Sequence, residues 1–174
     1  KPTLILLQYG GNEAQAGPAG LKDFAAQLGR LLDALAETKA RLVLLSPVRR
    51  EKPSGPLPDP SPYNRDLNVY CETLAEVARQ RRLAYVDLQD LFDDAPHVSE
   101  QGQESRPLRF TDNGLHPNEI GSAIASERLA AKLGAAASTW SVAIGSDGFK
   151  ASPGLEMRGL ERAADSVRFQ ATPP

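Results

Sequence analysis

The chain has 174 residues, and 20 Lys and Arg against 22 Asp and Glu leave a net charge of −2. This balance provides no basic field for a phosphate backbone, so we expect no nucleic-acid partner. The longest strictly apolar runs, Leu4–Leu7 and Leu42–Leu45, are too short to span a bilayer, and a single cysteine, Cys71, excludes an internal disulfide framework and a Cys-rich metal site.

The start of the chain alternates between apolar strands and an amphipathic helix. Thr3–Gln8 centres on a continuous apolar run, which predicts a parallel strand buried on both faces. A small-residue loop at Ala14–Gly20 follows, and apolar residues at helical spacing then predict a helix over about Leu21–Lys39. A second buried strand is predicted at Arg41–Ser46, where Pro47 stops it.

The alternation continues after a loop. Val48–Pro62 is rich in proline, which predicts irregular structure. The spacing of Leu67, Tyr70, Leu74 and Val77 predicts a second helix. It ends in the basic run Arg79–Arg82, which suits the negative end of a helix dipole. Leu83–Leu88 is predicted to be a third strand.

A polar loop and a third helix complete the alternating part. Ala95–Arg109 is polar and loop-like. Pro117 suits the first position of a helix, and Gly134 suits its end. The residues expected on the apolar face of this helix are Ile120, Ile124, Leu129 and Leu133.

Three strand–helix units predict an α/β fold, a three-layer sandwich with a flavodoxin-like parallel sheet. The pattern changes after Gly134, where Ser141–Ile144 and Ser166–Gln170 resemble short strands between Gly-rich turns. We therefore expect an α/β domain over residues 1–134 and a β-rich appendage, or a linker to a further module, over residues 135–174.

Ligands of an open parallel sheet bind beyond the carboxyl ends of its strands. Gly10, Gly11 and Asn12 follow the first strand. Glycines let a ligand approach the backbone, and an Asn carboxamide can donate to an oxygen that becomes negative during acyl transfer. An ordinary turn is the alternative explanation for these three residues.

The chain has two histidines, and one lies in a suggestive context. His116 follows Asn113 and Gly114 and precedes Pro117, so it starts a predicted helix. A general base needs a partner that fixes its tautomer, and either Asp112 or Asn113 could be that partner. The alternative is a solvated histidine at a helix start. His97, in a polar and acidic loop, is interpreted as non-functional.

Structural explanations are preferred for several other polar residues. Ser46 lacks a Gly-x-Ser-x-Gly elbow and is interpreted as a turn serine, and Cys71 as a small buried residue within a helix. The acids in the region after the third strand fit no metal-loop template; they are Asp87, Asp90, Asp93, Asp94 and Glu100. Arg49, Arg50 and Lys52 are interpreted as a solvated basic rim rather than part of a substrate cleft.

Together, the two motifs resemble those of the SGNH hydrolase superfamily, the GDSL esterases and lipases. In that family an Asn after the third strand donates to the oxyanion hole, and Gly10-Gly11-Asn12 matches its block, with Glu13 where the family usually has an acid. The catalytic His of the family is followed by a helix, as His116 is by Pro117-Asn118-Glu119. The strand that ends at Ser46-Pro47 resembles the fourth strand, and the resemblance covers about residues 3–134.

Two departures from the family pattern bear on activity. The Gly-Asp-Ser block that carries the serine nucleophile, and the Gly block that follows it, do not occur in this sequence. The position three residues before His116 is Asn113 where the family has an acid, and Asp112 lies four residues before it. Either Asp112 reaches the imidazole or the site works as a dyad with an amide or backbone partner.

The resemblance implies a hydrolase of small acyl esters, such as acetylated carbohydrates, that needs no cofactor and no metal. It also implies that the chain is an internal piece of a longer protein, whose serine lies outside it, and that these residues alone are close to inactive. Members of the family are commonly secreted or periplasmic, which the resemblance therefore suggests here, although no segment of this sequence is a recognisable targeting signal. An unprotected first strand, Leu4–Leu7, would favour self-association.

Two other functions stay open. One is a non-catalytic, flavodoxin-like binding module for a sugar or a protein partner, which the missing Ser and the missing acid favour. The other is a structural domain joined to other modules through Trp140–Pro174.

Overall fold

The computed structural model describes residues 1–52, 56–93, 97–98, 106–135, 142–145, 148–151, 155–163 and 167–172. The chain divides into two compact units, Lys1–Ala135 and Ala136–Pro174, which are described separately. Trp140, Asp94 and Glu100 lie outside the described residues.

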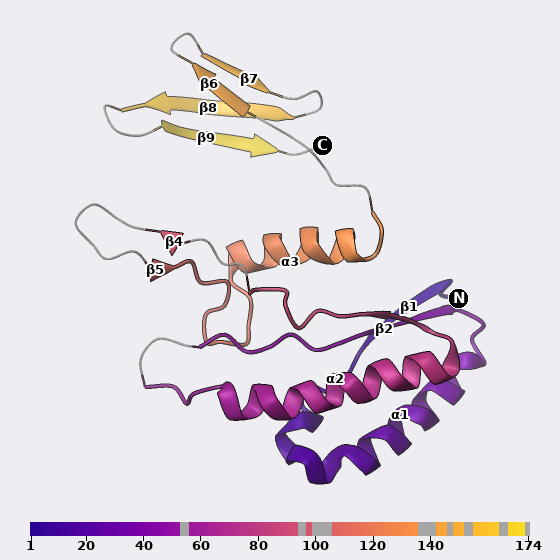
Figure 1. The fold of residues 1–174 in the computed structure, drawn as a ribbon. Helices are drawn as coiled ribbons and strands as arrows, with labels where there is room; N and C mark the ends of the chain where they lie inside the picture. The colour runs from indigo at the N-terminus through magenta and orange to yellow at the C-terminus, as the bar shows by residue number, and fades with distance from the viewer. Residues whose placement is uncertain are drawn as a thin grey trace. The chain divides into compact units, whose positions relative to one another are not determined.

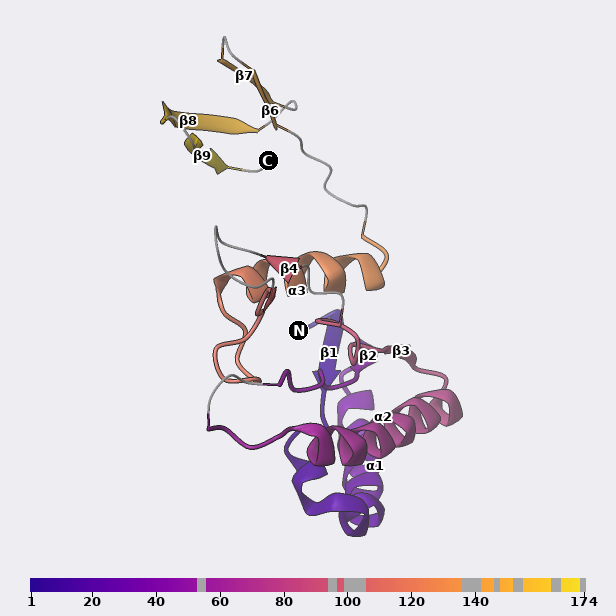
Figure 2. The same cartoon turned by 60° about the vertical axis from the view of Figure 1, so that its left-hand side comes forward.

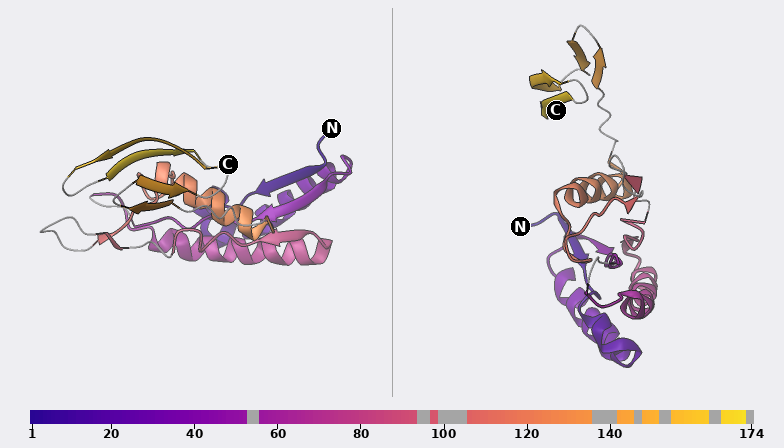
Figure 3. Two further views of the ribbon diagram at one scale, coloured as in Figure 1. Left: turned by 90° about the horizontal axis from the view of Figure 1, so that it is seen from above. Right: turned by 90° about the vertical axis from the view of Figure 1, so that its left-hand side faces the viewer.

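The first unit contains a parallel sheet of three strands in the order β1-β2-β3. β1 (Leu4–Gln8) pairs along its whole length with β2 (Arg41–Leu45), beside which it lies in Figure 3, left. β2 pairs on its other side with β3 (Ala84–Val86). The predicted α/β fold with a parallel sheet is confirmed.

Helices cover both faces of this sheet. α1 (Leu21–Ala36) and α2 (Ser61–Arg81) lie on one side of it, and α3 (Glu119–Lys132) lies on the other (Figures 1 and 2). Side chains of β2 alternate between the two cores, as the period of a strand requires. Leu42 and Leu44 pack with α1 and α2, whereas Val43 and Leu45 join the cluster under α3.

β1 is an edge strand with one exposed face. Ile5 and Leu7 pack against the α1–α2 core, but Leu4 and Leu6 are 48% and 42% exposed. The prediction that this strand is buried on both faces is therefore wrong for the structure described. The cluster under α3 draws its described strand residues from β2 and β3, so that helix does not cover β1.

Three local predictions also need correction. Residues expected in a loop after Asn12 form a 3₁₀ segment, η1 (Glu13–Gly20). The loop predicted before Arg109 contains two short antiparallel strands, β4 (His97–Val98) and β5 (Arg106–Pro107). α1 ends at Ala36, three residues before the predicted end.

Pro117 does not occupy the first position of α3. It pairs with Thr111 in an isolated antiparallel bridge, and the helix begins two residues later. Asn118 caps that helix, because its Oδ1 accepts a hydrogen bond from the Gly121 N–H at 2.8 Å. The predicted apolar face is only partly correct, since Ile124 and Leu129 pack on the core whereas Ile120 and Leu133 are exposed.

The second unit is built from β-hairpins. β6 (Val142–Gly145) pairs antiparallel with β7 (Gly148–Ala151), and β8 (Glu156–Arg162) pairs antiparallel with β9 (Val167–Thr172). β6 and β9 correspond to the two predicted strands, and β7 and β8 were not predicted. Within the described part of the chain, no helix is both long and apolar enough to cross a bilayer.

Candidate active site

The first strand leads into a tight turn at Gly10. Its φ of +103° lies in the region that glycine tolerates and other residues avoid. The Gly10 N–H donates to Glu13 Oε2 at 3.0 Å, and the Gly10 carbonyl accepts from the Ala14 N–H at 3.0 Å. These bonds reverse the chain at the sheet edge, so the following residues face the space beyond the strands.

Among the described residues, Asn12 has no hydrogen-bond partner for its carboxamide. It immediately precedes η1, but its side chain makes no capping hydrogen bond there, and the residue is exposed. Gly11 is fixed beside it, because its carbonyl accepts a hydrogen bond from Tyr63 Oη at 2.6 Å. The amide group is therefore available to a ligand, on a backbone that α2 holds in place.

The loop that carries His116 is closed on itself. The Asp112 N–H donates to the His116 carbonyl at 3.0 Å, and the Asn118 N–H donates to the Phe110 carbonyl at 2.9 Å. α3 approaches this loop very closely, since a Cβ added to Gly121 would lie 1.8 Å from the Phe110 carbonyl oxygen. Only glycine allows that approach, and it places the start of α3 directly against the loop.

Glu51, which no sequence pattern singled out, lies in the segment between β2 and α2 and anchors the same loop. Its carboxylate accepts hydrogen bonds from Thr111 Oγ1 and, at 3.3 Å, from the Phe110 N–H. Its own N–H donates to the Gly114 carbonyl at 3.0 Å. These contacts join positions about 60 residues apart, so no local pattern could reveal them.

Asn113 is the residue that contacts the imidazole. Its Oδ1 accepts hydrogen bonds from the backbone N–H groups of Leu115, at 3.1 Å, and His116, at 2.9 Å. Its Nδ2 lies 3.0 Å from His116 Nδ1. Among the contacts of the described residues, Asp112 is joined to His116 through the backbone only, and its exposed carboxylate does not bond the ring.

One cavity of about 670 Å³ lies where the two motifs meet. Gly10, Gly11 and Asn12 line it from the end of β1, and Leu115 and Pro117 line it from the other side. His116 is the residue between those last two, and it is exposed. The cavity is therefore lined by residues from both sequence motifs, about a hundred positions apart, although His116 itself is not one of its lining residues.

Arg49 and Arg50 both line this cavity, so the interpretation of a solvated rim is wrong for these two residues, and Arg50 has the more extensive contacts. Its guanidinium carbon lies 3.7 Å from the centre of the Tyr63 ring, a cation–π contact. Asn64 clamps the Arg50 backbone through two hydrogen bonds of 2.9 Å. Burial raises the pKa of Tyr63, an effect that the Arg50 charge opposes. Both Arg50 and Tyr63 line the cavity.

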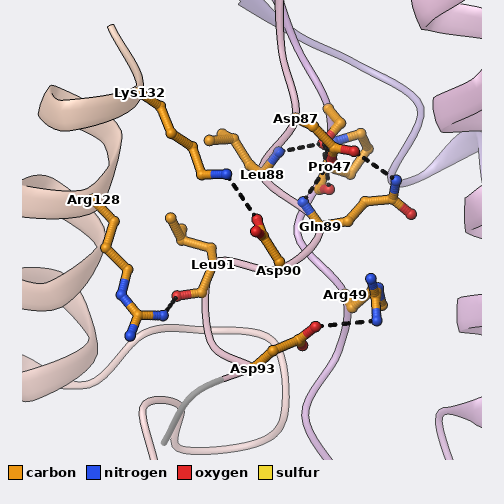
Figure 4. Close-up of polar contacts among 11 residues, drawn as sticks. Pro47, Arg49, Asp87, Leu88, Gln89, Asp90, Leu91, Asp93, Arg128 and Lys132 are labelled. Atoms are coloured by element: carbon orange, nitrogen blue, oxygen red, sulfur yellow. Dashed lines mark hydrogen bonds and ion pairs between the residues drawn. The ribbon is translucent and has the colours of Figure 1, made fainter. Parts of the chain in front are cut away.

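Leu91 and Phe92 also line the cavity, and ion pairs and hydrogen bonds hold the segment that contains them (Figure 4). On one side, Lys132 of α3 contacts Asp90 at 2.9 Å, and this hydrogen bond lowers the pKa of the Asp90 carboxyl. Arg128 of α3 donates to the Leu91 carbonyl at 2.6 Å. On the other side, Arg49 pairs with Asp93 at 3.2 Å. These acids thus have structural partners.

Ser46 and Cys71 are both buried and contact their own domain, in agreement with the structural interpretation given to them. Ser46 is fully buried; its Oγ donates to Asp87 Oδ1 at 2.9 Å and accepts from the Leu88 N–H at 2.7 Å. Cys71 is buried in the α1–α2 core, and burial raises the pKa of its thiol to about 12. In the described ranges, no cluster of three or more His, Cys, Asp or Glu side chains could hold a metal ion.

Solved structures share this fold at low sequence identity. A catalytic mutant of Axe2, an acetylxylan esterase from Geobacillus stearothermophilus, superposes with a TM-score of 0.57 and 17% identity, over 78% of this chain and 61% of Axe2. BT4096, a gut microbial diltiazem-metabolizing enzyme, superposes with a TM-score of 0.53 and 14% identity, over 99% of this chain and 42% of BT4096. The chain spans about three fifths of the length of Axe2.

A search of curated protein sequences gave no match. The sequence profile of the GDSL-like lipase/acylhydrolase family, in contrast, matches residues 1–124, which is most of the chain and all but the end of the first unit. The fold of the structural relatives agrees with this match. The chain belongs to the GDSL-like lipase/acylhydrolase family.

Proposed function

We propose that this chain is the C-terminal part of an SGNH-type hydrolase domain that cleaves small acyl esters through a serine ester. The observation that carries the proposal is the shared cavity, lined by Asn12 and by both neighbours of His116. Family membership supports ester hydrolysis in general. The order of the two motifs along the chain supports the same roles for their residues.

In the proposed reaction, an upstream serine hydroxyl attacks the carbonyl carbon of the ester. His116 takes the hydroxyl proton, and the new C–O bond leaves a tetrahedral intermediate with a negative oxygen. The Asn12 carboxamide and nearby backbone N–H groups donate to that oxygen. The bond to the alcohol then breaks, the alcohol leaves with a proton from His116, and water releases the acid from the serine.

Acetylated carbohydrates are the substrates that we favour. Axe2 is described as an acetylxylan esterase and as an acetyl-xylooligosaccharide esterase. The cavity suits a polar ligand with an apolar face, since Asn12, Glu13 and Arg50 line it together with the Tyr63 ring. No cofactor enters the proposed chemistry, and we propose that residues 135–174 form an appendage outside it.

The decisive experiment labels the full-length gene product with a fluorophosphonate and maps the modified peptide. We expect one labelled serine, in a Gly-Asp-Ser block upstream of Lys1, and loss of ester hydrolysis in the His116→Ala variant. The 174-residue chain alone should leave nitrophenyl acetate unhydrolysed. Hydrolysis by this chain at a rate that His116→Ala abolishes would show that the nucleophile lies within it.

A non-catalytic binding module is the second candidate, and the contact of His116 with an amide rather than an acid favours it. In that case the full-length protein would contain no serine that the fluorophosphonate modifies. It would still bind an acetylated xylo-oligosaccharide, and the Arg50→Ala variant would weaken that binding without any turnover.

A further inference from the structure

We propose that Asn113 is a positioning residue that holds His116 in the tautomer with its proton on Nε2. In this tautomer Nε2 is a hydrogen-bond donor, so the base of the proposed reaction is the less populated tautomer, which has its proton on Nδ1. The inference depends on three contacts within the loop, and the tautomer itself is independent of the proposed hydrolysis. Its consequence for the rate of hydrolysis rests on the proposed function.

The orientation of the Asn113 amide is set by the backbone. Two N–H groups, those of Leu115 and His116, point at one of its terminal atoms at 3.1 and 2.9 Å. Only the carbonyl oxygen can accept from them, because an amide NH₂ has no acceptor capacity. The atom that faces His116 Nδ1 at 3.0 Å is therefore the NH₂ group. Rotating the amide by half a turn would set donors against both backbone N–H groups.

The amide orientation determines the imidazole tautomer. An NH₂ group can only donate, so the His116 Nδ1 that it faces must carry the lone pair. A neutral imidazole with a free Nδ1 has its proton on Nε2. A catalytic base needs the reverse arrangement, with the proton on Nδ1 held by an acceptor and the lone pair on Nε2. The loop thus stabilises the tautomer with its proton on Nε2, and not the tautomer that a catalytic base requires.

The effect of an amide at this place is large in related chemistry. In a serine–histidine–aspartate triad, exchanging the acid for its amide lowers turnover by roughly 10⁴, because the histidine is held in the wrong tautomer. Asp is isosteric with Asn, and its carboxylate could keep both backbone hydrogen bonds on one oxygen. The second oxygen would then accept from Nδ1–H. Asn113→Asp should therefore convert the loop into the productive arrangement.

The test is NMR of the imidazole nitrogens in the ¹⁵N-labelled chain. The His97→Gln substitution removes the other histidine, so that His116 is the one imidazole observed. At about pH 8.5, where an ordinary imidazole is neutral, long-range ¹H–¹⁵N correlations distinguish the protonated nitrogen from the bare one. We expect a bare Nδ1 in the parent chain and a bare Nε2 after Asn113→Asp. A bare Nε2 in the parent, or no change after Asn113→Asp, would overturn the proposal.

Asp112→Asn is the matched control, since it changes the neighbouring acid to an amide in the same loop. Its side chain does not bond the ring, so the tautomer should stay that of the parent. A reversal in this variant would assign the positioning role to Asp112 and refute the inference. In the full-length protein, Asn113→Asp should raise kcat at least tenfold with little change in KM. A protein without turnover would refute the proposed hydrolase and leave the NMR result standing.

Discussion

Ser46 provides the sharpest test of how this domain is held together. Its hydroxyl is the hydrogen-bond acceptor for the Leu88 N–H at 2.7 Å, and both residues are buried, with exposed fractions of 0% and 3%. Ser46→Ala removes the acceptor and is too small a change to create a cavity. Asp87 loses one donor but keeps the Gln89 N–H at 2.9 Å. The main cost is therefore one buried N–H without a partner.

A buried donor without a partner costs about 1–3 kcal/mol, so we expect Ser46→Ala to lower the free energy of unfolding by about 2 kcal/mol. With a urea m-value of about 2 kcal/mol/M, the midpoint should fall by about 1 M. Circular dichroism at 222 nm follows the first unit, which contains α1, α2 and α3. Ser126→Ala is the control, because its exposed hydroxyl donates to the Ser122 carbonyl of its own helix and has no other partner in the described part of the chain.

We expect Ser126→Ala to change stability by less than about 0.5 kcal/mol. Equal midpoints for the Ser46→Ala variant and the parent would refute the reasoning, because they would mean that water or another group satisfies the Leu88 N–H. A midpoint shift accompanied by a changed m-value would indicate altered compactness and not a lost hydrogen bond.

Three further predictions concern stability and reactivity. Gly121→Ala should lower the free energy of unfolding in urea by at least about 2 kcal/mol, since its Cβ would collide with backbone. Gly29→Ala in α1 should raise it by about 0.5–1 kcal/mol, because its Cβ would make only an ordinary contact, 3.4 Å from the end of the Arg81 side chain. The hydrogen bond from Lys132 lowers the pKa of the Asp90 carboxyl in the folded state. The pair therefore adds fully to the free energy of unfolding at pH values above the unfolded-state pKa of about 4, and this contribution is lost as pH falls through the lower, folded-state pKa. Lys132→Met should therefore shrink the difference between urea midpoints at about pH 6 and pH 2.5; an unchanged difference would contradict the pairing. With its pKa raised to about 12, Cys71 should stay unmodified by dithionitrobenzoate at about pH 8 until urea unfolds the chain, and rapid native labelling would contradict its burial.

The fold class could be predicted from the sequence because each helix and strand is specified by the pattern of its own residues. The apolar run in β2 and the helical spacing in α1 and α2 each specify an element within one short window. The exposure of Leu4 and Leu6 was not readable, since burial of a strand face depends on which distant helix covers it. Pro117 was misplaced because its pairing with Thr111 outweighs the local preference of proline for a helix start.

The candidate site divides in the same way. Short motifs pointed to Asn12 and His116 as candidate site residues, because residue type and order along the chain are visible in sequence. Arg50 appeared to be part of a charged run until its contact with Tyr63, thirteen residues later, was seen. The role that we propose for Asn113 depends on which of its two amide atoms faces the ring, and the backbone N–H groups in the folded loop determine that.

Two consecutive residues after β2 connect to different partners. Arg50 turns to Tyr63 and Asn64 of α2, whereas Glu51 turns to Thr111 and the loop of His116. These two adjacent residues therefore join α2 to the loop of His116 at the candidate site. Deleting a single residue between Pro47 and Arg50 would shift both residues relative to β2, so the two sets of contacts could not form together in their present geometry. We therefore expect the length of this short segment to be under tighter constraint than its composition.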